Sequence, residues 1–179
     1  MEATPYVIYL TSTPKTLAID PACQTDLFYR YKMRQLTVQT IGNGKMIRTS
    51  FTNLNDVAND LKVPPAYIPH YLGKAIGAQA KYDQNKPAMQ RGSISGEHGT
   101  KELSNLLVRF IREFVLCGKC KLPELDYIAK KNDVEMCCHG CGWKGKVSTI
   151  PNMNEKFKRF VYTHPPPPRK DSKKPVRPG

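Results

Sequence analysis

Four of the six cysteines form two pairs with the spacing of a metal site. Two residues separate Cys117 from Cys120 and Cys138 from Cys141, and 17 residues lie between the pairs. Each C-x2-C turn brings two thiolates to one side, and two such turns complete the tetrahedral four-thiolate shell that structural Zn²⁺ prefers. The sequence therefore predicts a Zn²⁺ site held by these four cysteines.

Neighbouring side chains fit the predicted metal site less well. Three residues, instead of two, separate Cys137 from Cys141, and we expect Cys137 and Cys23 to be ordinary reduced thiols. His139 lies between two ligands and could bind the metal only by displacing one of them. Because the segment offers neither an open coordination position nor a nearby base, the zinc is expected to be structural. A ribbon of about 30 residues has too little apolar surface to fold alone, so metal binding and folding should be one event.

No P-loop or zinc-protease motif accompanies the cysteines. The sequence lacks GxxxxGK followed by Ser or Thr, and it lacks HExxH. Its other histidines stand in turn-like contexts without a nucleophile motif. We therefore expect a protein that is not itself an enzyme.

The net charge points to a polyanionic partner. Lys and Arg number 28 against 15 Asp and Glu, which gives +13 in a chain of 20.2 kDa. Nucleic acid is a better candidate than an acidic membrane, because no basic amphipathic helix or lipidation motif is present. No apolar run approaches the roughly 20 residues that span a bilayer, and no secretory signal is present, so we expect a cytoplasmic protein without a membrane partner. The alternative is a basic surface that serves only solubility.

The basic region begins at a cluster of aromatic residues. In the stretch DLFYRYKM, residues 26–33, Arg30 and Lys32 stand among three aromatic rings. Residues 1–27 carry three acids and one lysine, whereas residues 28–48 carry five cations and no acid. This stretch is therefore a first candidate for contact with an anionic partner.

These residues must be positioned by a fold that mixes helices and strands. Alternating apolar residues predict a hairpin of 36–40 and 46–51 around the turn GNGK at 42–45. The strongest apolar stripe is capped by Thr100 and predicts a long helix over 103–115 that leads directly into the first cysteine pair. Shorter elements are expected elsewhere: a strand at 6–10, a helix from the N-cap Asn53 to Pro64, a second helix ending at Gly73 or Gly77, strands at 78–83 and 89–95, and a helix around 153–161.

The predicted fold class is α+β, with a mixed α/β domain joined by the long helix to a four-cysteine zinc ribbon. We place a flexible N-terminal arm at 1–25, the α/β domain at 26–115, the zinc ribbon with a short C-terminal helix at 116–164, and a proline-rich basic tail at 165–179. The cation-bearing segments then lie in the α/β domain, and the metal site lies beyond the joining helix.

Several short stretches, taken in order, carry a family resemblance. They are FYRYKM at 28–33, PPAYIPHYLGKAIGAQ at 64–79 and IREFVLCGKC at 111–120, followed by the CxxCG ribbon. In that order they resemble the N-terminal domain of eukaryotic translation initiation factor five, the GTPase activator of initiation. The β subunit of initiation factor two has the same architecture and is the rival resemblance, but FYRYKM and the GAQ at 77–79 favour factor five.

The resemblance implies that Arg30 promotes GTP hydrolysis by the GTP-bound γ subunit of initiation factor two. Phosphoryl transfer spreads negative charge over the γ-phosphate oxygens, and a guanidinium supplied in trans can stabilise that charge. Two alternatives stay open: Arg30 could contact ribosomal RNA phosphate or stack on Tyr31, and the activating residue could be Arg34.

The resemblance also implies contacts with initiator tRNA, with rRNA of the small ribosomal subunit and with mRNA near the start codon. Glycines in the GNGK turn would permit close backbone approach, while cations meet phosphate. The alternative is a plain β-turn with an exposed lysine, and a structural subunit like the β subunit would bind without activating the GTPase. The RNA-contact residues that we predict are Lys32, Arg34, Gly42, Asn43, Gly44, Lys45 and Arg48.

Overall fold

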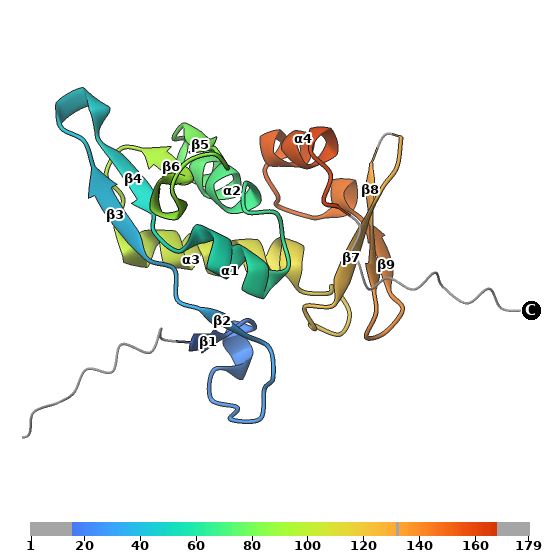
Figure 1. Ribbon diagram of the computed structural model, residues 1–179. Helices are drawn as coiled ribbons and strands as arrows, with labels where there is room; N and C mark the ends of the chain where they lie inside the picture. The colour runs from blue at the N-terminus through green and yellow to red at the C-terminus, as the bar shows by residue number, and fades with distance from the viewer. Residues whose placement is uncertain (1–15, 132, 168–179) are drawn as a thin grey trace, which may run out of the picture.

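The computed structural model describes residues 16–131 and 133–167 and confirms a mixed α/β fold (Figure 1). Within these residues the chain forms four α-helices and three antiparallel sheets, with strand orders β1-β2, β3-β4-β6-β5 and β7-β8-β9. The strands are β1 Thr16–Ala18, β2 Lys32–Arg34, β3 Val38–Ile41, β4 Arg48–Phe51, β5 Ala80–Tyr82, β6 Gly92–Ser95, β7 Leu125–Ala129, β8 Val134–Cys138 and β9 Lys144–Lys146. The helices are α1 Leu54–Leu61, α2 Tyr67–Ile76, α3 Thr100–Phe110 and α4 Glu155–Thr163. None of the described helices has the length and apolar character needed to span a bilayer.

The four-stranded sheet contains the predicted hairpin. β3 pairs with β4 from Val38 opposite Phe51 to Ile41 opposite Arg48, and a 3-10 turn at Gly44–Met46 connects the two strands. The two weakly patterned strands are confirmed as β5 and β6, which pair with each other and join β4 through β6.

α1 begins after Asn53, as predicted, although the side chain of Asn53 does not cap the helix. Its Oδ1 accepts a hydrogen bond from the Thr37 N–H at 2.9 Å, and its Nδ2 donates to the Gln35 carbonyl at 2.8 Å. Asn53 therefore ties the start of α1 to the chain that enters β3. Lys62 caps the C-terminal end of α1 with a left-handed φ of 57°, and Gly77, one of the two glycines predicted to end α2, caps that helix with φ of 74°.

α3 carries the predicted apolar stripe but is shorter than the predicted helix. It begins at Thr100, with Gly99 in the capping position that we assigned to Thr100, and it spans 11 residues. The chain continues as a π-helical turn over Ile111–Val115, in which the Leu116 N–H donates to the Ile111 carbonyl at 2.9 Å. α3 and this turn together carry the stripe to the first cysteine.

A cluster of aromatic rings joins the helices to the three-stranded sheet. Tyr67 of α2 makes edge contacts with Phe114 at 5.6 Å and with Phe157 of α4 at 5.9 Å between ring centroids. Tyr127 of β7 stacks on Phe114 at 4.7 Å, and its hydroxyl donates to the Phe114 carbonyl. One continuous core therefore contains side chains from the helices and from β7 and β8.

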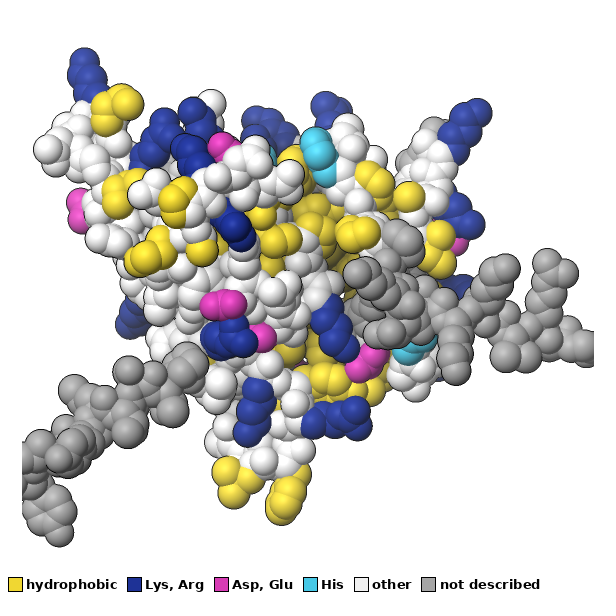
Figure 2. Space-filling model, in the orientation of Figure 1, with side chains coloured by type: hydrophobic (Ala, Val, Ile, Leu, Met, Phe, Trp, Pro, Cys, Tyr) yellow, Lys and Arg dark blue, Asp and Glu magenta, His cyan; other side chains and the backbone are white. Residues whose placement is uncertain are grey.

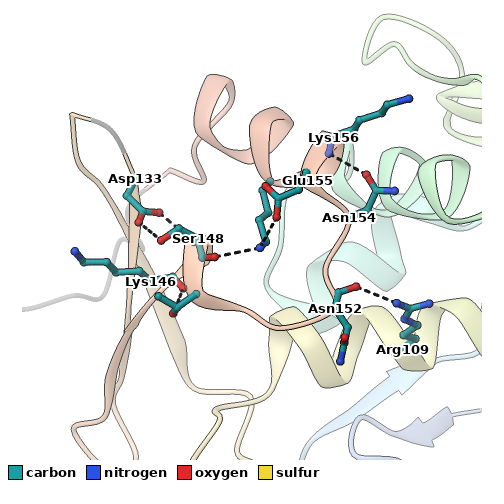
Figure 3. A network of polar contacts seen from close by, with 10 residues as sticks. Arg109, Asp133, Lys146, Ser148, Asn152, Asn154, Glu155 and Lys156 are labelled. Carbon is teal, nitrogen blue, oxygen red and sulfur yellow. Dashed lines mark hydrogen bonds and ion pairs between the residues drawn. The ribbon is translucent and has the colours of Figure 1, made fainter.

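Polar contacts hold the segment that leads into α4 between the three-stranded sheet and α3 (Figure 3). The Asn154 side chain accepts from the Lys156 N–H at 2.9 Å and caps α4. The Asn152 carbonyl accepts from Arg109 of α3 at 3.0 Å. Asp133 accepts from Ser148, whose carbonyl accepts from the buried Lys158 ammonium at 3.1 Å. The predicted C-terminal helix is thus confirmed and is docked on both neighbours.

The N-terminal segment differs from the arm that the sequence predicted at 1–25. Residues 16–25 form β1, which pairs with β2, and a 3-10 turn at Pro21–Cys23. Ile19, beside this strand, is buried and keeps the segment on the core. The predicted strand at 6–10 and the end of the basic tail, 168–179, lie outside the described residues.

Candidate functional site

The four predicted ligand cysteines lie together at one end of the three-stranded sheet. The Sγ atoms of Cys117 and Cys141 are 3.7 Å apart, those of Cys120 and Cys138 are 3.5 Å apart, and all four lie within 4.8 Å of one another. A disulfide would bring two sulfurs to about 2.05 Å. A tetrahedral shell with Zn–S bonds of about 2.3 Å places its sulfurs about 3.8 Å apart. The spacing of these sulfurs therefore fits a four-thiolate metal site.

The two cysteine turns share two backbone features. The Lys121 N–H donates to the Cys117 carbonyl at 3.1 Å, and the Gly142 N–H donates to the Cys138 carbonyl at 2.9 Å. In each turn the residue after the second cysteine is left-handed, with φ of 59° at Lys121 and 71° at Gly142. The sequence indicated this role for Gly142, because glycine adopts positive φ at little cost. Lys121 takes the same conformation without that advantage.

The surroundings of the sulfurs shift the pKa of the Cys117 thiol and that of the Cys138 thiol in opposite directions. Burial alone would raise the pKa of the Cys117 thiol, but N–H donors from Cys120 and Lys119 and neighbouring thiols lower it to about 7. Burial raises the pKa of the Cys138 thiol to about 12. A thiolate at Cys138 therefore needs a nearby cation, and a soft divalent metal supplies one.

Two side chains that could have competed for the metal lie elsewhere. Cys137 is the neighbour of Cys138 on β8, and successive side chains of a strand point to opposite faces. The ring Nε2 of His139 contacts the carboxylate of Asp126, and its backbone N–H donates to the Glu124 carbonyl at 2.9 Å. Both residues are outside the sulfur cluster.

Arg30 lies on a closed loop, residues 19–31, between β1 and β2. The Ile19 N–H donates to the Tyr31 carbonyl at 2.9 Å and closes the loop at its base. Gln24 bonds twice to the backbone of Ala18, accepting at 3.3 Å and donating at 2.9 Å. The loop is therefore held by specific hydrogen bonds on both sides of its turn.

The side chain of Arg30 is exposed and lies over an aromatic ring. Its guanidinium carbon is 5.3 Å from the ring centroid of Tyr31, within the range of a cation–π contact. Burial raises the pKa of Tyr31, and so do its hydrogen bond with Glu124 and the charge of that carboxylate. Because Glu124 immediately precedes β7, Tyr31 links the Arg30 loop to the cysteine-bearing module.

Arg34, the other candidate activating residue, is engaged within the fold. Its Nη1 lies 2.8 Å from the carboxylate of Asp56, and its backbone N–H donates to Asp60 at 2.8 Å. Both acids belong to α1, so Arg34 fastens β2 to that helix. Lys32, on the same strand, is exposed.

The GNGK turn is shaped by its glycines. Gly42 has φ of 87°, and a Cβ at this position would lie 2.4 Å from the Met46 carbonyl oxygen, so glycine alone fits. Asn43, Gly44 and Lys45 are exposed, and Arg48 is half-buried on β4. Lys45 and Arg48 line an open hollow of about 430 Å³ beside the turn.

The predicted contact residues form separate regions. The β3–β4 turn lies on the far side of the molecule from the three-stranded sheet, and the loop between β1 and β2 projects from a third place (Figure 1). Lys and Arg side chains gather along one edge of the molecule, from the β3–β4 hairpin past α2 and β5 to the end of β7 and β8 (Figure 2). The structure does not bring Arg30 and the GNGK turn together.

A family model for the domain found in initiation factors 2B and 5 matches residues 21–144, more than half of the chain. The chain belongs to this domain family. It is 34% identical over 141 residues to eukaryotic translation initiation factor 5 of Caenorhabditis elegans, and 36% identical to the proteins of that name from Mus musculus, over 144 residues, and Saccharomyces cerevisiae, over 150. These matches cover 79%, 79% and 83% of this chain and 31%, 32% and 35% of the relatives. The chain thus spans about a third of their length.

The span that the family model matches contains Arg30, the GNGK turn and all four cysteines of the cluster. The resemblance to the N-terminal domain of initiation factor 5 is therefore confirmed. Sequence reasoning did not identify Lys121 as a left-handed turn residue or Tyr31 as a link to Glu124. The position of Lys121, directly after a C-x2-C pair and equivalent to Gly142, was the available signal for the first. No sequence signal indicated the second.

Proposed function

We propose that this chain acts as a translation initiation factor, which stimulates GTP hydrolysis by the γ subunit of initiation factor 2 and helps to stabilise start-codon recognition. The observation that carries the proposal is the exposed guanidinium of Arg30 on a hydrogen-bonded loop. The names of the relatives support a role in translation initiation, and a cytoplasmic location follows from that role.

Arg30 supplies a permanent positive charge to a reaction that takes place on another protein. In phosphoryl transfer, negative charge is spread over the equatorial oxygens of the γ-phosphate, and a guanidinium in trans stabilises it. A loop that is already ordered loses less conformational freedom on binding than a free arm would. The contact with Tyr31 is weak enough to exchange for a triphosphate, whereas the ion pair of Arg34 holds two elements together.

We infer that Cys117, Cys120, Cys138 and Cys141 hold Zn²⁺ and that this part of the chain is a zinc ribbon. The sulfur spacing and the cost of a buried thiolate at Cys138 support the metal. The ion would be structural, since all four positions are taken by sulfur, and it would fix the loops that flank β7 and β8.

A second function is supported by the basic edge of the molecule. Lys45 and Arg48 beside the GNGK turn are suited to phosphates of rRNA, initiator tRNA or mRNA, and Lys32 offers a further cation. A module that only binds the preinitiation complex, as the β-subunit alternative requires, would need these residues and not Arg30. Replacing Lys45 with Ala should then weaken binding to the small ribosomal subunit and flatten its salt dependence.

The activator role is tested with Arg30→Ala in reconstituted preinitiation complexes. Trans-acting arginines are worth about 10³ to 10⁵ in rate, so we expect the hydrolysis rate at saturating factor to fall by about 1,000-fold or more. Arg30→Lys should not restore it, because an ammonium lacks the planar fork. Lys101→Ala, which removes an exposed cation on α3 outside every predicted contact region, is the control. An unchanged rate in Arg30→Ala contradicts the proposal.

A further inference from the structure

The loop that carries Arg30 has an inner side and an outer tip. Tyr29 and Tyr31 contact each other edge to face at 5.7 Å, and Tyr31 also packs against the core. Leu27 and Phe28, at the tip, are 86% and 94% exposed, more than any other large apolar side chain that the structure describes. Figure 2 shows apolar side chains at the end of this projecting loop. The aromatic cluster of the sequence is therefore divided between the fold and the solvent.

The tip is an ordered turn. The Asp26 carboxylate accepts from the Phe28 N–H at 2.9 Å, and the Asp26 carbonyl accepts from the Tyr29 N–H at 3.3 Å. On the other side of the loop, Asp20 accepts from the Ala22 N–H at 2.9 Å. This backbone holds Leu27 and Phe28 in water, where large apolar side chains are unfavourable. Adjacent exposed apolar side chains on an ordered projection are typical of an interaction site.

The charge of the loop indicates which kind of partner covers the tip. The loop itself, residues 19–31, carries two carboxylates, Asp20 and Asp26, and one cation, Arg30, with the exposed Lys32 following at its base, in a chain whose net charge is +13. A nucleic acid or an anionic membrane would meet these carboxylates next to the tip, and like charges repel. An apolar cleft on a protein has no such conflict.

We propose that Leu27 and Phe28 dock into an apolar cleft on the protein whose nucleotide Arg30 approaches. This inference rests on the proposed function for the position of Arg30. Two peptide units separate Phe28 from Arg30, so the two Cα atoms lie within about 7 Å of each other. A partner that binds Phe28 therefore also fixes the position of the Arg30 Cα. Tyr29, folded against Tyr31, leaves both flanking side chains exposed. Leu27 and Phe28 are thus positioning residues, and Arg30 supplies the charge.

The experiment measures binding to the γ subunit separately from the maximal rate of GTP hydrolysis. Leu27→Ser, Phe28→Ser and the double variant are made in the full chain, with Met89→Ser, 55% exposed on another surface, as the control. Binding to the GTP-loaded γ subunit is measured without RNA, together with the maximal rate of hydrolysis. We expect each tip variant to weaken binding by about 10-fold and the double variant by about 100-fold, with the maximal rate retained. Met89→Ser should bind as the unchanged protein does.

The outcomes distinguish this inference from the proposed function. If the double variant binds the γ subunit as tightly as the unchanged protein does, the docking proposal is overturned, whether or not the maximal rate of hydrolysis falls. If Arg30→Ala keeps full stimulation while the double variant binds weakly, the activator role fails and docking stands. The docking proposal is also overturned if the double variant binds phosphatidylserine vesicles or a ribosomal RNA fragment more weakly while its binding to the γ subunit is intact. Circular dichroism and metal content check that the exposed substitutions leave the fold intact.

Discussion

The four-stranded and the three-stranded sheets keep their shape in different ways. In the first, Phe51 on β4 and Ile94 on β6 are fully buried beneath helices, and α2 packs against β5 and β6. The second is half-covered: β8 alternates between buried and partly buried positions, and its end is occupied by cysteines. Apolar burial accounts for the first sheet. We infer that the second needs a metal as well as the stack of Tyr127 on Phe114.

The difference predicts that the two sheets respond separately to loss of the metal. We expect Cys138→Ser, or chelation, to remove one equivalent of zinc and to abolish protection of amides in β7 and β8, because binding and folding of such ribbons are linked. Amides in β4 and β6 should keep most of their protection. Native-state hydrogen exchange and elemental analysis measure both effects.

The matched control for the metal prediction is Cys137→Ser, which removes the neighbouring thiol outside the cluster. It should keep the metal and the protection pattern. Protein that lacks bound zinc and yet protects both sheets equally would contradict the difference between them.

A substitution in the apolar core should destabilise the four-stranded sheet, which loss of the metal is expected to spare. Phe51→Ala leaves a cavity under the four-stranded sheet and should lower the free energy of unfolding by about 3 to 5 kcal/mol in zinc-loaded protein. Urea denaturation measures it, and Met89→Ala at an exposed site should change the value by less than about 0.5 kcal/mol. A loss below about 1 kcal/mol in Phe51→Ala would show that this sheet does not depend on apolar burial.

The smallest predicted effect concerns the contact between α2 and α4. His70 stacks on Phe160 at 3.9 Å, and burial, with Lys74 and His164 nearby, lowers its pKa below 6.5. Below about pH 6.5 the unfolded chain takes up a proton that the folded chain resists, so stability falls as the pH falls. His70→Gln should reduce this dependence between pH 7 and 5, measured as urea midpoints. If the dependence of stability on pH is unchanged in His70→Gln, titratable groups other than His70 cause that dependence.

Local patterns were enough to predict the four helices, the strands β3 to β6 and the cysteine cluster. The apolar stripe of α3 and the alternation in β3 and β4 each depend on neighbours along the chain, and both formed where expected. The choice of Cys138 over Cys137 in the cluster followed from the C-x2-C spacing. The helix that leads to the cysteines was predicted as one unit, but it changes to a π turn at Ile111, for which we have no physical account.

The segment before Asp26 was harder to predict because its structure depends on distant partners. β1 is three residues long, and its only described partner strand, β2, begins 14 residues after it ends. A strand so short has little pattern of its own. Gln24, which closes this loop onto Ala18, gives no signal in the sequence that it does so.

By itself, the sequence predicted the four-cysteine cluster, the turn that contains Gly42, the four helices and the strands β3 to β6. Spacing and periodicity are properties of neighbouring residues, so they can be read without the folded structure. Tertiary structure alone decided which cations are available to a partner. The Arg34 guanidinium pairs with Asp56, 22 residues away, while Arg30 remains exposed, and Leu27 and Phe28 face solvent while Tyr31 packs against the core. The physical reason is that an ion pair or a buried ring requires two segments to meet, and only the folded chain brings them together.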